Sequence, residues 1–142
     1  MELKVKLNRE GAKAPVRANP TDAGADLFAP FTAVIPPYSH IFIDFGISIE
    51  LPKNTVGYIF ARSSLGSKFG IRPRNCVGVI DEKYRGNLGI MLENHSEDEI
   101  CITKGDRIAQ LVVSPVFTPE IKVVDELDMT DDRQGGFGST GK

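Results

Sequence analysis

The chain has 142 residues, 41% of them hydrophobic, which is enough for one folded domain with its own core. Its formal net charge of −2 argues against a general nucleic-acid binder, although a few focused cations would suffice to bind a small anion. No apolar stretch approaches the length of a membrane span and the N-terminus has no signal-peptide core, so we expect neither nucleic acid nor membrane as a partner.

The two cysteines, Cys76 and Cys101, each lie within an apolar run and lack the paired spacing of a zinc site. A single disulfide would contribute little to the stability of a chain of this length. We therefore expect buried free thiols in a reducing compartment, and hence a cytoplasmic location.

Alternating or apolar runs predict short strands in the first half of the chain. Residues 3–7 alternate apolar and charged side chains, and residues 25–28 form a short apolar run that includes Asp26. Further strands are expected over residues 34–35, 41–51 and 57–61. Residues 63–69 then leave room for about two helical turns before Gly70 ends them.

The second half continues in the same pattern. Residues 77–80 and 88–92 are apolar runs around a short polar tip with a glycine, which predicts a β-hairpin with a buried first strand. Strands are also expected over residues 100–102, 107–113 and 121–124. Many short strands separated by Gly and Pro turns predict an all-β sandwich or barrel, and the polar outward faces favour a jelly roll.

The polar tip of the central hairpin carries Asp81 and Tyr84. Asp81 follows the apolar run directly, so its carboxylate could be partly desolvated and still face a cleft. A plain hairpin tip would not need Tyr84. Taken alone, this stretch favours an ordinary charged turn, which is what most such tips are.

The composition changes near residue 125, which predicts a domain over residues 1–125 and a flexible, Gly-rich arm over residues 126–142. The arm is either a frayed terminus or a mobile segment whose amides and hydroxyls wrap an anion while Phe137 covers a flat group. Residues 136–142 imitate half of a phosphate-binding loop, but the required strand before it and helix after it are missing from the sequence pattern.

Five short motifs occur in order along the chain: DAGADL at 22–27, ARSSLG at 61–66, GVIDEKYRG at 78–86, GDRIAQ at 105–110, and the Gly/Phe tail. Together they resemble the trimeric, all-β dUTPase family (deoxyuridine triphosphate nucleotidohydrolases). The resemblance implies a distorted jelly-roll homotrimer with one short helix and three active sites at subunit boundaries. It also implies hydrolysis of dUTP to dUMP and pyrophosphate by water attack on the α-phosphate, with Mg²⁺ carried by the triphosphate. This reaction limits uracil incorporation into DNA and supplies dUMP for dTMP synthesis.

The resemblance also implies roles for individual residues. Asp81 corresponds to the general base that activates the attacking water, and Tyr84 to the ring that packs against the deoxyribose. The uracil edge would be read by Asn75, Gly78, Val79, Ile80 and Gly89. The phosphates would be held by Arg62, Ser63, Ser64 and Gln110, with Asp26 as a support. In the tail, Phe137 would close over uracil while Arg133, Gly138, Ser139 and Thr140 reach the γ-phosphate.

The chain departs from the family pattern at several positions. Ala25 stands in place of a usual Tyr, Ala61 in place of Pro, and Ser64 in place of Gly. The tail arginine of the family precedes its Phe by one residue more than Arg133 precedes Phe137, so a gap-free match would place Asp132 there. We favour Arg133, because an aspartate would repel phosphate.

Two other functions remain as alternatives. One is a dCTP deaminase, or a bifunctional deaminase and dUTPase, on the same fold, although the motif at 78–86 and the Phe-containing tail favour a plain dUTPase. The other is a regulatory protein that docks a partner and senses dUTP through its tail.

Overall fold

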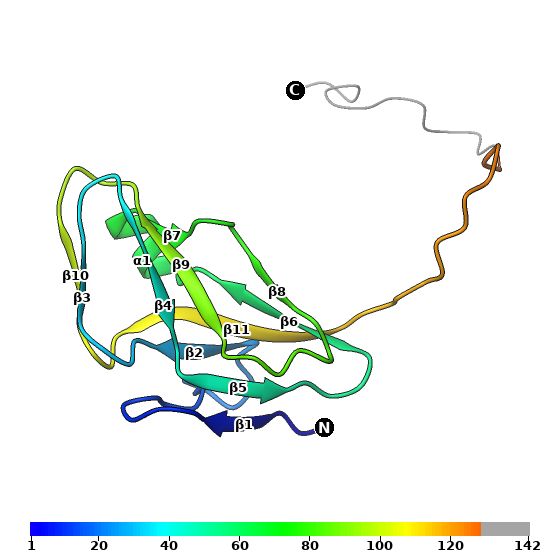
Figure 1. The fold of residues 1–142 in the computed structure, drawn as a ribbon, viewed down its shortest axis with the longest axis horizontal. Coiled ribbons are helices and arrows are strands. Elements are labelled where there is room, and N and C mark those ends of the chain that lie inside the picture. The colour runs from blue at the N-terminus through cyan, green and yellow to red at the C-terminus, as the bar shows by residue number, and fades with distance from the viewer. Residues whose placement is uncertain (129–142) are drawn as a thin grey trace.

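The structure, a computed structural model, describes residues 1–128. Within these residues the chain forms eleven strands and one short helix (Figure 1). The strands are β1 (Lys4–Leu7), β2 (Gly24–Phe28), β3 (Ala33–Ile35), β4 (His40–Asp44), β5 (Ile47–Glu50), β6 (Thr55–Phe60), β7 (Ile71–Pro73), β8 (Gly78–Ile80), β9 (Gly89–Asn94), β10 (Ile100–Ile102) and β11 (Arg107–Pro115). Helix α1 (Ser63–Phe69) lies between β6 and β7. The predicted all-β class with one short helix is confirmed.

The strands are distributed over two larger sheets and two ribbons, and every pair is antiparallel. One sheet has the order β2-β11-β6-β8 and the other β4-β9-β7, while the ribbons are β1-β5 and β10-β3. Figure 1 shows β11 running along β2 and β6, so that the last strand ties the start of the chain to its middle. Antiparallel sheets joined by crossovers between non-sequential strands form the predicted distorted jelly roll.

The alternating side chains of the sheets meet in one apolar core. Leu27 on β2, Ile59 on β6 and Leu111 on β11 come from the larger sheet, and Leu92 on β9 from the other. Each of these side chains is almost fully buried. Burial of this kind is the main favourable term in folding, so the core holds the two sheets together.

Helix α1 has the bounds that the sequence predicts. It begins at Ser63 and ends at Phe69, and Gly70 follows in the left-handed conformation with φ of 65°. The Gly70 amide donates to the carbonyl of Leu65, which closes the last turn. Glycine adopts a positive φ without steric cost, and this explains why the helix ends there.

The predicted central hairpin is wrong. Strand β8 pairs with β6, whereas β9 pairs with β4 and β7, so the two runs belong to different sheets. The first run is also not buried, because Val79 is 62% exposed. Apolar runs and a turn signal locate strands, but the partner of each strand is decided by packing of the whole chain.

The single strand expected over residues 41–51 is interrupted at Gly46. Its φ of 69° turns the chain, and its amide donates to Oδ1 of Asp44 at 2.7 Å. Strand β4 then pairs with β9, while β5 pairs with β1. The glycine therefore lets one alternating run serve two sheets.

Two smaller expectations are also wrong. Both cysteines are exposed, Cys76 in a turn with φ of 63° and Cys101 on the outward side of β10. Residues 121–124 form no strand, because no strand within residues 1–128 pairs with them. Within residues 1–128, no helix has the length and apolar character needed to cross a membrane.

Asn94, at the end of β9, is fully buried and fastens three segments together. Its side-chain nitrogen donates to the carbonyls of Ile35, Pro36 and Asp98, at 3.1, 3.1 and 2.7 Å. Its oxygen accepts hydrogen bonds from the amide and hydroxyl of Ser96, at 2.9 and 2.7 Å. The Asn94 side chain thus supplies hydrogen-bond partners for the backbone carbonyls of residues 35, 36 and 98 and for the backbone amide of Ser96.

Replacing Asn94 with the similarly sized leucine is expected to lower the free energy of unfolding by about 3 kcal/mol, because several buried polar groups lose their partners. Urea denaturation at fixed protein concentration measures this loss. The exposed Asn19→Leu serves as control, since the Asn19 side chain bonds only to Asp22. Equal stabilities of the two variants would contradict the role of Asn94.

Candidate active site

Three of the predicted base-reading residues line one cavity of about 370 Å³. Asn75, Gly78 and Gly89 come from the turn after β7, from β8 and from β9. Apolar side chains complete the walls: Phe42, Ile59, Pro73, Ile90 and Met91. A half-open cavity with apolar walls and one amide suits a flat heterocycle that presents polar edge atoms.

The two glycines keep this cavity open. A β-carbon at Gly89 would collide with the ring of Phe42, and one at Gly78 would lie 3.3 Å from Cβ of Ile59. Asn75 is held in its turn by a hydrogen bond from its Nδ2 to the carbonyl of Val77, at 3.1 Å. The cavity wall is therefore backbone at two positions and a fixed side-chain amide at a third.

Val79 and Ile80 occupy different places from their neighbours on β8. Val79 lines a second cavity of about 220 Å³, together with Asp81 and Tyr58. Ile80 packs partly buried against the core. Alternation along a strand explains this division, because successive side chains point to opposite faces.

Asp81 follows β8 directly and is exposed, so this chain alone does not desolvate its carboxylate as the sequence suggested. It lies on the second cavity, next to Glu82, whose Oε2 accepts a hydrogen bond from the Asn54 amide at 2.7 Å. Tyr84 is 43% exposed, and its hydroxyl donates to the carbonyl of Asn87 at 2.9 Å. An exposed carboxylate can bind and orient a water, which is the first requirement of a general base.

The predicted phosphate-binding residues gather around Asp26. Arg62 Nε lies 2.8 Å from Oδ1 of Asp26, and Arg107 Nη1 lies 3.3 Å from its Oδ2. The cavity beside them measures about 210 Å³ and is also lined by Ser63 and Gln110. Nε2 of Gln110 donates to the carbonyl of Ala61 at 2.9 Å, which fixes the chain just before Arg62. We call this cavity the anion site, because two guanidinium groups and a hydroxyl are donors suited to phosphate oxygens, although the carboxylates of Asp22 and Asp26 line it as well.

Ser64 lies exposed in the first turn of α1, beside Ser63. The remaining predicted residues belong to the tail. Arg133, Phe137, Gly138, Ser139 and Thr140 lie outside the described residues.

Two features of the site escaped the sequence reasoning. The motif at 105–110 contains Arg107 without indicating a role for it, and its ion pair with Asp26 joins it to the anion site. Phe42 was read only as part of a strand, although its ring covers Gly89. An arginine directly after the turn at Gly105 and Asp106 could have indicated Arg107, whereas Phe42 has no local signal because Gly89 is distant in sequence.

The base cavity, the Asp81 cavity and the anion site have no lining residue in common among the described residues. They open at separate places on one chain, although β6 contributes to two of them and Arg62 follows its end. One chain therefore presents three separate cavities without joining them.

Comparison with known proteins gives a consistent result. A family model described as dUTPase matches residues 10–141. The deoxyuridine 5'-triphosphate nucleotidohydrolase of Clostridium tetani is 46% identical over 140 residues, which cover 99% of this chain and 97% of that protein.

Solved structures agree with the sequence comparison. The Staphylococcus bacteriophage 80alpha dUTPase with dUpNHpp superposes with a TM-score of 0.92 at 34% identity, covering 99% of this chain and 98% of that one. The dUTPase from phage phi11 of S. aureus, a mutant studied for coordination of a structural Mg(II) ion, gives a TM-score of 0.84 at 31% identity, over 91% of this chain and 100% of that one.

Proposed function

This chain belongs to the dUTPase family, and we propose that it hydrolyses dUTP to dUMP and pyrophosphate by attack of water on the α-phosphorus. In the cell this reaction limits uracil incorporation into DNA and supplies dUMP for dTMP synthesis. The observation that carries the proposal is the position of β8. Gly78 on this strand lines the base cavity, and Asp81, which follows the strand directly, lines the cavity beside it.

Uracil is the base that this cavity suits. The amide of Asn75 and the backbone of β8 can match its alternating carbonyl and N–H edge. Close walls at Gly89 and Phe42 leave little room for the methyl group of thymine. The amino group of cytosine would mispair with the same edge, which is a strong basis for rejection.

Asp81 acts as the general base in this proposal. Its exposed carboxylate accepts the proton of the water as the oxygen attacks the α-phosphorus. Tyr84 packs against the deoxyribose and rejects a 2′-hydroxyl. Pyrophosphate leaves with negative charge, which the guanidinium groups of Arg62 and Arg107 stabilise.

A homotrimer would join the separated parts. The anion site of one subunit would face the base cavity of another, as the subunit-boundary sites of the family imply. The described residues after β11 support an oligomer, because they carry apolar side chains that the rest of residues 1–128 leaves uncovered. Phe117, Ile121 and Val123 are each more than 90% exposed, and Leu127 is 84% exposed.

The substrate is proposed to be the magnesium complex of dUTP. Phosphate oxygens are ligands that Mg²⁺ prefers, and the bound ion offsets part of the negative charge of the triphosphate, while the guanidinium groups offset more of it. Within residues 1–128 no three acidic, histidine or cysteine side chains converge on a metal site. The arm over residues 126–142 is proposed to close the site, and the free thiols suit a cytoplasmic enzyme.

The proposal is tested by pyrophosphate release from dUTP, dTTP, dCTP and UTP with magnesium present. We expect turnover with dUTP and at least about a hundredfold lower kcat/KM for the other three, in line with discrimination by unpaired polar groups. Ammonia release from dCTP would favour the deaminase instead. Equal turnover of all four nucleotides would refute the base assignment.

Asp26 offers a separate test of the anion site. Asp26→Asn removes the carboxylate that holds Arg62 and Arg107, so both guanidinium groups lose their common anchor. We expect kcat/KM for dUTP to fall by about tenfold to a hundredfold, the cost of a misplaced charge contact. Steady-state kinetics measure this, with the exposed Asp98→Asn as control. Equal kinetics of both variants would contradict the supporting role of Asp26.

A further inference from the structure

The loop between β8 and β9 carries Asp81 and Tyr84 but has little apolar anchorage. Every residue from Lys83 to Asn87 is exposed, and the first buried residue after them is Leu88. Inside the loop, the Tyr84 amide donates to the carbonyl of Asp81 at 3.0 Å. Arg85 Nη1 donates to the carbonyl of Glu82 at 2.7 Å. These bonds shape the loop but do not fix it to the body of the protein.

Two side chains of the loop fix it to the body, one at each end. At the start, Glu82 accepts the hydrogen bond from the Asn54 amide. At the end, the Asn87 side chain forms hydrogen bonds with Asn8, Asp44 and Ser48. Its Oδ1 accepts a hydrogen bond from Nδ2 of Asn8 at 2.6 Å, and its Nδ2 donates to Oδ2 of Asp44 at 3.0 Å.

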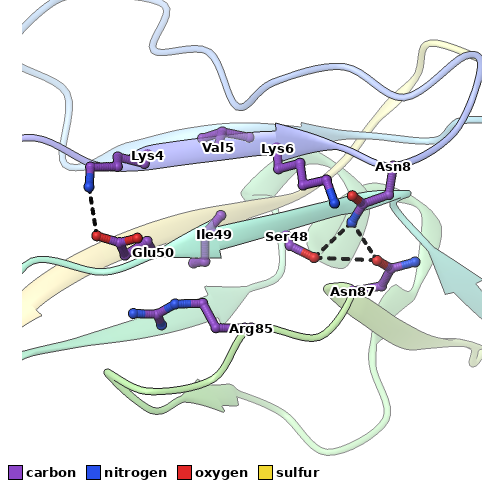
Figure 2. A pocket seen from close by; sticks show the side chains of 9 residues that line it. All are labelled: Lys4, Val5, Lys6, Asn8, Ser48, Ile49, Glu50, Arg85 and Asn87. Atoms are coloured by element: carbon purple, nitrogen blue, oxygen red, sulfur yellow. Dashed lines mark hydrogen bonds and ion pairs between the residues drawn. The ribbon is translucent and has the colours of Figure 1, made fainter.

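Figure 2 shows Asn8, Ser48 and Asn87 as a triangle of hydrogen bonds above the loop. Nδ2 of Asn8 also donates to Oγ of Ser48, at 2.7 Å. Asn8 follows β1, Ser48 lies on β5 and Asp44 ends β4. The single side chain of Asn87 therefore ties the loop to β4, to β5 and to the residue that follows β1.

Asn87 also holds Tyr84, through its backbone. The carbonyl of Asn87 accepts the hydrogen bond of the tyrosine hydroxyl, so the ring position follows the position of Asn87. We propose that Asn87 is a positioning residue, which sets the Tyr84 ring against the sugar and keeps Asp81 in place through its contacts with Asn8 and Asp44. This inference rests on the proposed function, since it concerns the selectivity of that site.

The groove beside the network, about 600 Å³ in volume, supplies the control. Lys6 lines it on the same strand face as Lys4, and in the described part of the chain no hydrogen bond joins it to Asn87 (Figure 2). Lys4 is unsuitable, because its Nζ lies 2.8 Å from Oε1 of Glu50. The hydrogen bond from Lys4 lowers the pKa of Glu50, and its counterpart raises the pKa of Lys4. Lys6→Ala therefore changes the groove without changing the network.

The first arm of the test is kinetic. Asn87→Ala keeps the backbone carbonyl but removes the side-chain bonds to Asn8, Ser48 and Asp44, and Asn8→Ala removes the first of these. We expect the ratio of kcat/KM for dUTP to kcat/KM for UTP to fall about tenfold in Asn87→Ala and about threefold in Asn8→Ala, as expected for one or two lost hydrogen bonds. The double variant should match Asn87→Ala, because both residues act through one contact. Lys6→Ala should match the wild type.

The second arm does not depend on activity. Trypsin cleaves after Lys83 and Arg85, which both lie in the loop, so the cleavage rate there reports how often the loop opens. We expect that rate to rise about tenfold in Asn87→Ala and to stay unchanged in Lys6→Ala, with mass spectrometry identifying the cut. Thermal unfolding should change little, because the backbone of Leu88 stays bonded to Phe45 and Ile47.

The proposal requires both arms. An unchanged dUTP-to-UTP ratio in Asn87→Ala, or unchanged cleavage in the loop, would overturn it, as would a loss of stability without a loss of selectivity. If Asn87→Ala does not fold, Asn8→Ala decides by the same two readouts. A wild-type protein that releases no pyrophosphate from dUTP would contradict the proposed function instead, and the cleavage arm would still decide whether Asn87 positions the loop.

Discussion

Asp81→Asn is expected to abolish dUTP hydrolysis while the protein still binds dUpNHpp with nearly wild-type affinity. Asparagine has the size of aspartate and can still hold a water by hydrogen bonds, but it cannot take the proton that the attacking water must lose. We expect kcat to fall by about a thousandfold or more, which is within the usual range for loss of a general base. Pyrophosphate release measures turnover, and calorimetric titration with the analogue measures binding.

A second carboxylate beside Asp81 provides the control. Glu82 lines the same cavity, but its side chain is already engaged by the Asn54 amide. Glu82→Gln keeps an acceptor for that amide, so we expect no more than a few-fold loss of kcat. If instead Glu82→Gln is inactive and Asp81→Asn retains full turnover, the general base has been assigned to the wrong carboxylate.

Local features of the sequence predicted the positions of most elements. The bounds of the helix over residues 63–69 were predicted. Its end at Phe69 could be predicted because Gly70 has a conformation that other residues adopt only with strain. The strand over residues 3–7 was visible from its alternation. These features depend on a few neighbouring residues, and so a single sequence contains them.

Strand pairing could not be predicted in the same way. The runs at β8 and β9 were read as partners because a short polar tip separates them, yet each pairs with strands that lie far away in the chain. The same limit applies to Gly46, whose turn sends β4 and β5 to different partners. Pairing depends on the packing of the whole core, which no window of residues reports.

The site shows the same division. Asn75, Gly78 and Gly89 meet in one cavity, and Arg62, Ser63 and Gln110 in another, as the motifs indicated. The structure added the contacts that the motifs do not encode. Phe42 reaches Gly89 from another strand, and Asn87 reaches Asn8 from a distant part of the chain. Motifs identify the groups of a site, whereas the residues that position them are found only in three dimensions.

A chain that ends at Asp132 is expected to lose turnover by about a hundredfold or more while its thermal unfolding stays within a few degrees of the full chain. The last buried apolar side chain among residues 1–128 is Leu111, so removing residues 133–142 takes nothing from that core. The lost residues include Phe137 and Arg133, which in the proposed site close over the base and bind the γ-phosphate. Closure of such an arm excludes water and fixes the triphosphate for attack, and losses of this size follow when positioning is lost.

Point variants separate the two contributions of the arm. Phe137→Ala should raise KM through lost stacking, and Arg133→Ala should lower kcat/KM through a lost phosphate contact. Lys142→Ala is the control, because it removes a cation of the same arm that has no assigned role. Wild-type turnover by the truncated chain would refute the closing role, and a large fall in its unfolding temperature would show that the arm contributes to the fold. If Arg133→Ala were silent while truncation was severe, the one-residue shift in the tail would place the phosphate contact elsewhere in residues 134–142.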